Sequence, residues 1–322
     1  MLSSHRNSIY EYFKAVPLTD LVPKNQHLVL LKEDQTLQEV VNQLSQHRIL
    51  AAPVLTKEGK LLGMLSVLDI VQYIVASAPN VDQLKNLSEV EIAGRCITLQ
   101  TAKNVMGFSA RDQFLPLKSN VPSTMAVELF SQGVHRCVVE EDVTTDLYIG
   151  TLSQSDIVKR LSEHLHMGKL KNLGAKLASD LGLGLVQPVV VKESQLVLET
   201  MKQLASSNVS AVAVVNDKDE LVGNFSASDL RGFYLDRLPH FDFPTSVFLE
   251  KYSASSLKPF CTKLEGLTFV ELVKLLIHPE VQGEKLNHSM HRVWIVDDAK
   301  KVIGVITLTD IMKVIRDYDE QL

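Results

Sequence analysis

The chain has 322 residues, of which 45% are hydrophobic and 22% charged, and its formal net charge is −5. This is the composition of an ordinary globular protein with room for two domains, and the negative charge argues against a general nucleic-acid binder, which usually carries a basic surface. The opening residues lack a signal-peptide core and no apolar run approaches the ~20 residues of a membrane span, so we expect no membrane association and a cytoplasmic location, with the nucleus as a second compartment.

The first predicted elements lie between residues 27 and 78. After a short apolar strand at 27–31, an amphipathic helix is indicated by the i, i+3, i+4, i+7 spacing of Leu37, Val40, Val41 and Leu44. The segment AAPVL (51–55) then predicts a buried strand, TKEGK a turn, and LLGML (61–65) a second strand. The helical pattern DIVQYIVAS closes the unit, which gives the order strand–helix–strand–strand–helix.

The same order recurs three more times along the chain. Each unit contains a string that begins with Gly, has Ser or Thr three residues later and ends with Asp: GMLSVLD (63–69), GTLSQSD (150–156), GNFSASD (223–229) and GVITLTD (304–310). Amphipathic segments precede these strings, as in TMAVELFSQ and FVELVKLLI, and helical patterns follow every Asp. The chain is therefore predicted to be an α/β protein of four structural repeats.

One repeat of this size cannot bury all its faces, so we expect the repeats to pack in pairs. Sequential pairing would give two lobes of about 160 residues, with the break in the glycine-containing stretch 167–184. The predicted segments are an N-terminal segment (1–26), repeat 1 (27–78), a linker (79–104), repeat 2 (105–166), a linker between the pairs (167–184), repeat 3 (185–236), a linker (237–256) and repeat 4 (257–322).

The repeated string has a purely structural interpretation. A Ser or Thr three residues before an acid is the pattern of a capping box, which contributes about 1 kcal/mol to a helix and suits the positive end of its dipole. The candidate N-cap residues are Ser66, Ser153, Ser226 and Thr307, and their acids are Asp69, Asp156, Asp229 and Asp310.

Other features of the string indicate a ligand. A carboxylate held at a helix start can accept two hydrogen bonds from a vicinal diol such as a ribose, while helix N–H groups and hydroxyls can donate to nucleotide oxygens. A second hydroxyl stands directly before the Asp in three repeats, as Ser155, Ser228 and Thr309, whereas the first repeat has Leu68.

Two repeats also carry a His-Arg pair between the first helix and the following strand. These are His135–Arg136 in GVHRCVVEED and His291–Arg292 in SMHRVWIVDD. Arg presents a planar fork that matches phosphate oxygens two at a time, and two such pairs converging on one place could hold a nucleotide phosphate. The alternative is that these cations pair with the EED or DD acids on neighbouring strand ends.

No motif in the sequence indicates catalysis. It lacks a P-loop, a GxSxG elbow and an HExxH motif, and no nucleophile–base pair has a catalytic spacing, so we expect no enzymatic activity. The HLH segment (164–166) lacks a spaced set of further ligands, and we expect neither a metal site nor a required cofactor. Cys96, Cys137 and Cys261 are far apart and odd in number, as is typical of buried thiols in a reducing compartment.

The four repeats resemble CBS domains, and the four-repeat chain is similar to the γ subunit of AMP-activated protein kinase. The residues that carry the resemblance are HRCVVEED and MHRVWIVDD in repeats 2 and 4, NVSAVAVVNDKDELV in repeat 3, GVITLTDIMKVI in repeat 4, and NSIYEYFKAVPLTDLVP at the N-terminus. The resemblance implies two Bateman modules that meet as a flat disk, regulatory ligands AMP, ADP and ATP in clefts, and the catalytic (α) and scaffold (β) subunits of a kinase as partners.

The resemblance also implies roles for individual residues. Ribose binding would fall to Asp69, Asp156, Asp229 and Asp310. Phosphate binding would fall to His135, Arg136, His291 and Arg292, with Ser155, Ser228 and Thr309. Supporting roles would fall to Ser66, Ser153, Ser226, Thr307 and Arg48.

Three departures from the family pattern leave a second interpretation open. Leu50 stands where the animal subunit has an arginine, with Arg48 two positions earlier; all four aspartates are present; and HPEVQGEKLNHS is an unusual insertion. A stand-alone four-repeat scaffold or inhibitor, for example of a phosphatase, with empty sites or another ligand, is therefore the alternative to a kinase subunit.

Overall fold

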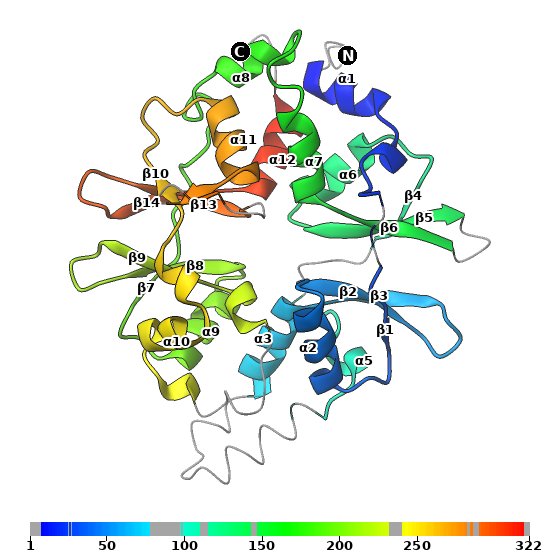
Figure 1. Ribbon diagram of the computed structural model, residues 1–322, viewed down its shortest axis with the longest axis vertical. Helices are drawn as coiled ribbons and strands as arrows, with labels where there is room; N and C mark the ends of the chain where they lie inside the picture. Colours follow the sequence, from blue (N-terminus) through cyan, green and yellow to red (C-terminus); the bar gives the residue numbers. More distant parts are fainter. Residues whose placement is uncertain are drawn as a thin grey trace. The chain divides into compact units, whose positions relative to one another are not determined.

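Each repeat forms one three-stranded sheet, in which a short first strand pairs parallel with the second and the second pairs antiparallel with the third (Figure 1). The computed structural model describes residues 8–24, 26, 28–77, 97, 99–109, 115–142, 147–231, 240–281, 284–285 and 290–318. The four sheets have the orders β1-β2-β3, β4-β5-β6, β7-β8-β9 and β10-β13-β14. This confirms the predicted α/β class and the four repeats.

The elements follow the predicted order in each repeat. Repeat 1 contains β1 (Leu31–Lys32), α2 (Leu37–Gln46), β2 (Ala51–Leu55), β3 (Leu61–Ser66) and α3 (Val67–Ser77). Repeat 2 contains β4 (Leu117–Lys118), α6 (Thr124–Ser131), β5 (Arg136–Asp142), β6 (Leu147–Ser153) and α7 (Gln154–Ser162). Repeat 3 contains β7 (Val190–Lys192), α9 (Val197–Ser206), β8 (Ala211–Val215), β9 (Leu221–Ser226) and the 3₁₀ turn η3 (Ala227–Leu230). Repeat 4 contains β10 (Cys261–Thr262), α11 (Phe269–Ile277), β13 (Arg292–Val296), β14 (Val302–Thr307) and α12 (Leu308–Asp317).

Short elements lie outside this pattern. They are α1 (Ser8–Ala15), η1 (Leu18–Asp20), α5 (Ala102–Val105), α8 (Leu170–Ala175), α10 (Thr245–Tyr252) and η5 (Ala254–Leu257), together with an antiparallel pair in the insertion, β11 (Glu280–Val281) and β12 (Glu284–Lys285). Most of the predicted linker 79–104, with Cys96, lies outside the described residues. Among the described residues, no helix is both long enough and apolar enough to cross a bilayer.

Repeat 3 departs from the prediction that a helix follows every Asp. After Asp229 the described residues form only a 3₁₀ turn, and Arg231 has extended backbone angles.

The chain divides into two compact units that interleave its sequence. Unit 1 comprises residues 1–27, 115–187 and 260–322 and so contains repeats 2 and 4; unit 2 comprises residues 28–114 and 188–259 and contains repeats 1 and 3. Helix packing explains this division, because α12 contacts α6 and α7, whereas α3 contacts α9 and η3. Pairing of the repeats is therefore confirmed, and each compact unit joins two repeats that are not adjacent in the sequence.

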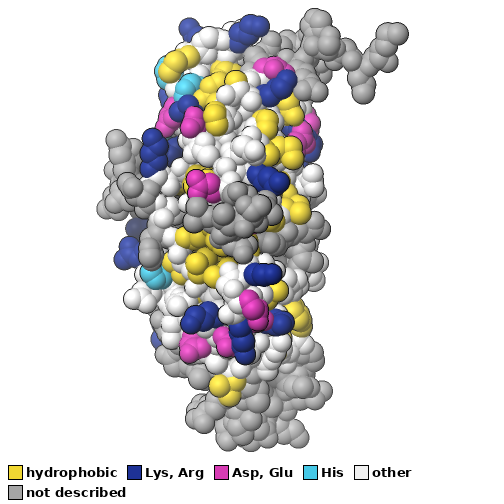
Figure 2. Space-filling view, turned by 90° about the vertical axis from the view of Figure 1, so that its right-hand side faces the viewer, with side chains coloured by type: hydrophobic (Ala, Val, Ile, Leu, Met, Phe, Trp, Pro, Cys, Tyr) yellow, Lys and Arg dark blue, Asp and Glu magenta, His cyan; other side chains and the backbone are white. Residues whose placement is uncertain are grey.

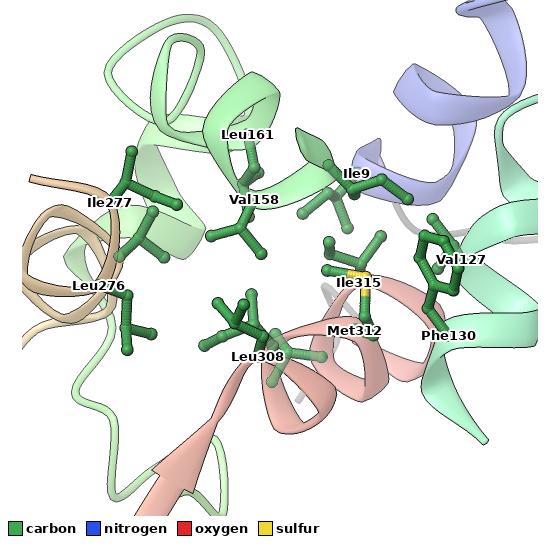
Figure 3. Close-up of a cluster of buried hydrophobic side chains, with 14 of the residues drawn as sticks. Ile9, Val127, Phe130, Val158, Leu161, Leu276, Ile277, Leu308, Met312 and Ile315 are labelled. Atoms are coloured by element: carbon green, nitrogen blue, oxygen red, sulfur yellow. The ribbon is translucent and has the colours of Figure 1, made fainter. Parts of the chain in front are cut away.

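The core of unit 1 is built from helices that gather on one side of its two sheets (Figure 1). Helix α12 buries Leu308, Ile311, Met312 and Ile315, whose spacing places them on one face of the helix. Figure 3 shows Met312 and Ile315 beside Phe130 of α6, in one cluster with apolar residues of α1, α7 and α11. Full burial of such side chains stabilises the unit by about 1.5–3 kcal/mol each.

Unit 2 has a separate core of the same kind. It is formed by α2, α3, α9 and α10, with Phe225, Phe248 and Met201 among its fully buried side chains. On the face drawn in Figure 2, basic and acidic side chains of the described residues are interspersed.

Close contacts with other segments surround the glycine that begins the repeated string in repeats 2 and 4. A Cβ built on Gly304 would lie 2.0 Å from the carbonyl oxygen of Gly184, where the chain leading to repeat 3 runs beside β14 and Val186 bridges to Val305. A Cβ on Gly150 would lie 2.7 Å from Oε1 of Gln26, which accepts a hydrogen bond from the backbone N–H of Thr151. The last strand of each of these two repeats is therefore covered by a segment from another part of the chain.

Candidate functional site

Both His-Arg pairs belong to unit 1 and occupy equivalent positions. Arg136 begins β5 and pairs across the sheet with Ser153, the N-cap of α7; Arg292 begins β13 and pairs with Thr307, the N-cap of α12. Paired residues on neighbouring antiparallel strands lie about 5 Å apart, so each arginine starts its strand beside the beginning of a helix.

A backbone hydrogen bond fixes this arrangement. The carbonyl of His135 accepts from the N–H of Gln154 at 3.1 Å, and the carbonyl of His291 accepts from the N–H of Leu308 at 3.1 Å. The corresponding bonds in unit 2 join Leu50 to Val67 at 2.8 Å and Ser210 to Ala227 at 3.2 Å. All four repeats thus have this backbone hydrogen bond, whereas only the two repeats of unit 1 have a His-Arg pair beside it.

The hydroxyl–Asp strings form the predicted boxes at the helix starts. In every repeat one carboxylate oxygen, Oδ2, accepts from both the backbone N–H and the hydroxyl of the N-cap residue, at 2.6–2.9 Å. The structural interpretation is therefore confirmed for Oδ2, and any ligand contact depends on the other oxygen, Oδ1.

In unit 1 the Oδ1 atoms remain accessible to further donors. Among the described residues, Oδ1 of Asp156 has no hydrogen-bond partner, and Oδ1 of Asp310 has only a 3.4 Å contact with Lys313 on the same helix. Both side chains are partly exposed. These two carboxylates can accept the two hydrogen bonds of a vicinal diol without losing their boxes.

In unit 2 the Oδ1 atoms of the box aspartates already accept hydrogen bonds from serines of the chain. Oδ1 of Asp69 accepts from the backbone N–H of Ser109 at 2.9 Å, and Oδ1 of Asp229 accepts from the hydroxyls of Ser253 and Ser256. Asp69 is 2% exposed and Asp229 is 6% exposed. A ribose at either position would have to displace donors that belong to the chain itself.

Burial and nearby positive charges shift the pKa of Asp156 in opposite directions. Burial raises the pKa of Asp156, and the hydrogen bonds from Ser153 and the positive charges of Arg136 and Lys159 partly offset that rise. The neighbouring Cys137 is buried, which raises the pKa of its thiol to about 12 and makes a reactive thiolate unfavourable.

Strand geometry separates the arginines from the acids at the end of their own strands. Asp297 follows β13 at its far end, roughly 16 Å from Arg292 at ~3.3 Å per residue. Asp297 instead accepts from the backbone N–H of Lys301, and Asp298 pairs with Lys263. The nearer acid is the one in the box, since the charge of Arg136 acts on Asp156.

The two helix starts of unit 1 are joined directly. The side-chain amide of Gln154, the first residue of α7, donates to the hydroxyl of Thr309 in α12 at 2.9 Å. Arg136 pairs with Ser153, which precedes Gln154, and Arg292 pairs with Thr307, two residues before Thr309. The strand starts of both arginines therefore lie near the two helix starts that this bond joins.

Unit 2 has no cation at the corresponding strand starts, which are Ala51 and Ala211. Arg48 is exposed and has a left-handed backbone (φ 53°), the conformation of Gly133 and Asn208 after the first helices of repeats 2 and 3. The carbonyl of Arg48 accepts from the guanidinium of Arg231 at 2.8 Å. Arg48 thus marks a helix end, three residues before the strand start at Ala51.

Several of the other predicted residues have defined contacts. The hydroxyl of Ser228 lies 2.6 Å from that of Ser226, within the box of repeat 3. His164 of the HLH segment packs on Tyr12 and its Nδ1 lies 3.0 Å from the carbonyl of Arg160. Among the described residues, no cluster of His, Cys, Asp or Glu could hold a metal ion.

Sequence reasoning missed Gln154, Ser109, Ser253 and Ser256. Gln154 could have been found from the repeat alignment, because the same position is apolar in the other repeats, as Val67, Ala227 and Leu308. The three serines lie outside the repeated strings, and nothing in the sequence connects them with Asp69 or Asp229.

Comparison with known protein families identifies the class. The model of the CBS domain matches residues 19–76, 184–236 and 271–317. Repeat 2 lies outside these matches but has the same strand order and the same hydroxyl–Asp box. The chain therefore belongs to the CBS-domain proteins and contains four such repeats.

Similar proteins indicate a narrower group within the CBS-domain proteins. SNF1-related protein kinase regulatory subunit gamma-like PV42a of Arabidopsis thaliana is 25% identical, and the match covers 94% of this chain and 95% of that protein. The related PV42b of the same organism is 24% identical, and the match covers 95% of this chain and 96% of that protein. Protein SDS23 of Yarrowia lipolytica is 27% identical over 66% of this chain, which spans 44% of that protein. Protein MJ1225 from Methanocaldococcus jannaschii has the same fold, with a TM-score of 0.68 at 14% identity over 92% of this chain and 99% of its own. The chain is thus homologous to kinase gamma-like regulatory subunits.

Proposed function

We propose that this chain is a non-catalytic regulatory subunit that binds adenine nucleotides and adjusts the activity of a Ser/Thr protein kinase of the AMP-activated type. Support for the kinase comes from the gamma-like relatives, which match nearly its whole length. AMP, ADP and ATP would compete for the same sites, and their different phosphate charges would favour different conformations of the bound kinase. Regulation of this kind requires that the kinase in turn changes nucleotide affinity.

The observation that carries the ligand proposal is the junction in unit 1. There, Asp156 and Asp310 keep one oxygen for a ribose, while His135, Arg136, His291 and Arg292 stand at the adjacent strand starts. Charge-assisted hydrogen bonds contribute about 1.5–3 kcal/mol each, so two arginines and two diol contacts approach the ~8 kcal/mol of micromolar binding. Ser155 and Thr309 would assist with phosphate oxygens.

The geometry favours fewer sites than the four aspartates suggest. In unit 2, Ser109, Ser253 and Ser256 occupy the carboxylate oxygens that a ribose would need, and no cation stands at the strand starts. We therefore assign nucleotide binding to unit 1 and a structural role to Asp69 and Asp229.

Calorimetric titration of the purified chain with AMP and with adenosine tests the ligand. We expect Arg292→Ala to weaken AMP binding by on the order of 10- to 100-fold, as the loss of one charge-assisted contact implies, and to change adenosine binding less than twofold. Arg48→Ala is the matched control, because it removes an exposed arginine from unit 2 and should leave both affinities unchanged. Absence of AMP binding by the unaltered chain would refute the proposal.

Affinity purification of the chain tests the partner. Recovery of kinase catalytic and scaffold subunits is the expected result. Recovery of a phosphatase without kinase subunits would instead support the alternative, a stand-alone scaffold or inhibitor. The similarity to Protein SDS23 is the reason for testing this alternative.

A further inference from the structure

Gln154 is a polar residue where the fold requires an apolar one. It is the first residue of α7 and only 4% of its surface is exposed. The residues at the same position in the other repeats are Val67, Ala227 and Leu308, each buried at its own helix start. Burying an amide without partners is unfavourable, so the presence of Gln154 at this position calls for a specific set of hydrogen bonds.

Those hydrogen bonds fix the orientation of the amide. Nε2 of Gln154 lies 3.1 Å from the carbonyl oxygen of Phe130, 3.1 Å from that of Val134 and 2.9 Å from Oγ1 of Thr309. Carbonyl oxygens can only accept, so the group that faces them must be the NH₂ and not the amide oxygen. The hydroxyl of Thr309 therefore accepts a hydrogen bond from Gln154.

This contact determines what Thr309 can offer to a ligand. A hydroxyl has one proton, and an oxygen that accepts from Gln154 retains its own O–H for donation elsewhere. Thr309 stands next to Asp310 and close to the strand starts of the two arginines. The Thr309 O–H is therefore available to donate, and its donation suits an anionic oxygen, which can only accept.

The same amide connects three parts of the junction. Val134 precedes His135, Gln154 precedes Ser155 and Asp156, and Thr309 precedes Asp310. The phosphate-binding and ribose-binding residues of repeats 2 and 4 are thereby held through one side chain.

We propose that Gln154 is a positioning residue for phosphate recognition in unit 1, which keeps the Thr309 hydroxyl as a hydrogen-bond donor toward an anionic ligand and ties the two repeats together. This rests on the proposed function. It adds to that function a residue whose identity decides whether the site discriminates AMP from adenosine.

A double-mutant cycle on the full chain tests the inference, with AMP and adenosine as probes. Gln154→Met keeps the length of the side chain and removes its N–H groups, and Thr309→Val keeps the shape and removes the hydroxyl. We expect each single variant to weaken AMP binding about 5- to 10-fold and adenosine binding less than twofold. Because Gln154 acts through Thr309, the double variant should bind AMP no more than about twofold weaker than Thr309→Val alone.

The other outcomes are distinct. Unchanged AMP affinity in Gln154→Met, losses that multiply in the double variant, or an equal loss for adenosine would each overturn the positioning role while leaving the proposed function intact. Failure of the unaltered chain to bind AMP would overturn both. If Gln154→Met does not fold, Gln154→Leu replaces it, since Leu308 already fills this position in repeat 4.

Discussion

At the scale of the residue, four near-identical strings differ in what surrounds a single atom. Oδ2 of every box aspartate is used by its own N-cap, and only Oδ1 distinguishes the repeats. In repeats 1 and 3 that oxygen accepts from serines elsewhere in the chain, whereas in repeats 2 and 4 it remains accessible to a ligand. The same motif thus has a structural role in unit 2, and in unit 1 it leaves the oxygen that our proposal assigns to a ligand.

Substitution of the box aspartates should separate these two roles. We expect Asp156→Ala and Asp310→Ala each to lower the AMP stoichiometry or affinity in calorimetric titration. Asp69→Ala and Asp229→Ala should leave AMP binding unchanged but lower the free energy of unfolding by about 2 kcal/mol, because the buried donors lose their acceptor. Loss of AMP binding in Asp229→Ala, with a stable fold, would contradict the assignment.

The pKa of Asp156 gives a prediction about pH. Burial raises this pKa, so the protonated form is favoured in the folded state, and the resulting stability is present below the unfolded value near ~3.9 and is lost as pH rises through the folded value. Asp156→Asn cannot titrate. The free energy of unfolding of the unaltered chain minus that of Asp156→Asn should therefore increase as pH falls from 7 toward 4, as measured by chemical denaturation. A difference that decreases over this range would show that the pKa is lowered instead.

The sequence predicts those parts of the candidate site that belong to a repeated pattern. The boxes and the His-Arg positions could be predicted because each is written at a fixed offset in a repeated string. The serines on Asp69 and Asp229 could not, because their contacts depend on the path of segments that have no repeated pattern. Gln154 lies between these cases, since its exceptional polarity was visible but its partner in repeat 4 was not.

At the level of helices and strands, the segments that lie beside β6 and β14 account for Gly150 and Gly304, which the helix caps do not require. The helices and strands were predictable from apolar spacing, as in α2, which buries Leu37, Val40, Val41 and Leu44. The segments that cover β6 and β14 were not predictable, because residues 22–26 and 184–186 have no periodic pattern. They make the last strand of these repeats an inner position in which a side chain at the glycine has no room.

Replacement of Gly304 tests this packing. We expect Gly304→Ala to lower the free energy of unfolding by about 3 kcal/mol, because its Cβ would lie 2.0 Å from the carbonyl oxygen of Gly184 and must displace backbone. Gly223→Ala, at the same position of repeat 3, is the control, since its nearest atom is the Cβ of Val214 at 3.3 Å. Denaturant unfolding of both variants provides the measurement, and an equal cost for the two would show that covering by the segment at Gly184 is not the cause.

At the scale of the whole molecule, helix packing across the sequence defines the units. Repeats 2 and 4 share one core, with Val158 and Leu161 beside Leu276 and Ile277, and repeats 1 and 3 share the other (Figure 3). Sequence similarity identifies four repeats but carries no information on which helix faces meet, because the first helices of repeats 1, 3 and 4 have comparable apolar stripes. This is why the sequence reveals the four repeats but not which of them share a core.

The interleaved units predict how a divided chain behaves. A cut between Met167 and Gly168 separates repeats 1 and 2 from repeats 3 and 4, and so leaves half of each core on either fragment. Expressed alone, residues 1–167 and 168–322 should each expose the apolar faces of their helices and aggregate or remain partly unfolded, because each core buries side chains from both fragments. Expressed together, they should co-purify as a one-to-one complex and bind AMP, since the junction of Gln154 with Thr309 can form between fragments. Size-exclusion chromatography with light scattering distinguishes the cases: two stable, monomeric fragments that do not associate would show that the cores follow the order of the chain after all.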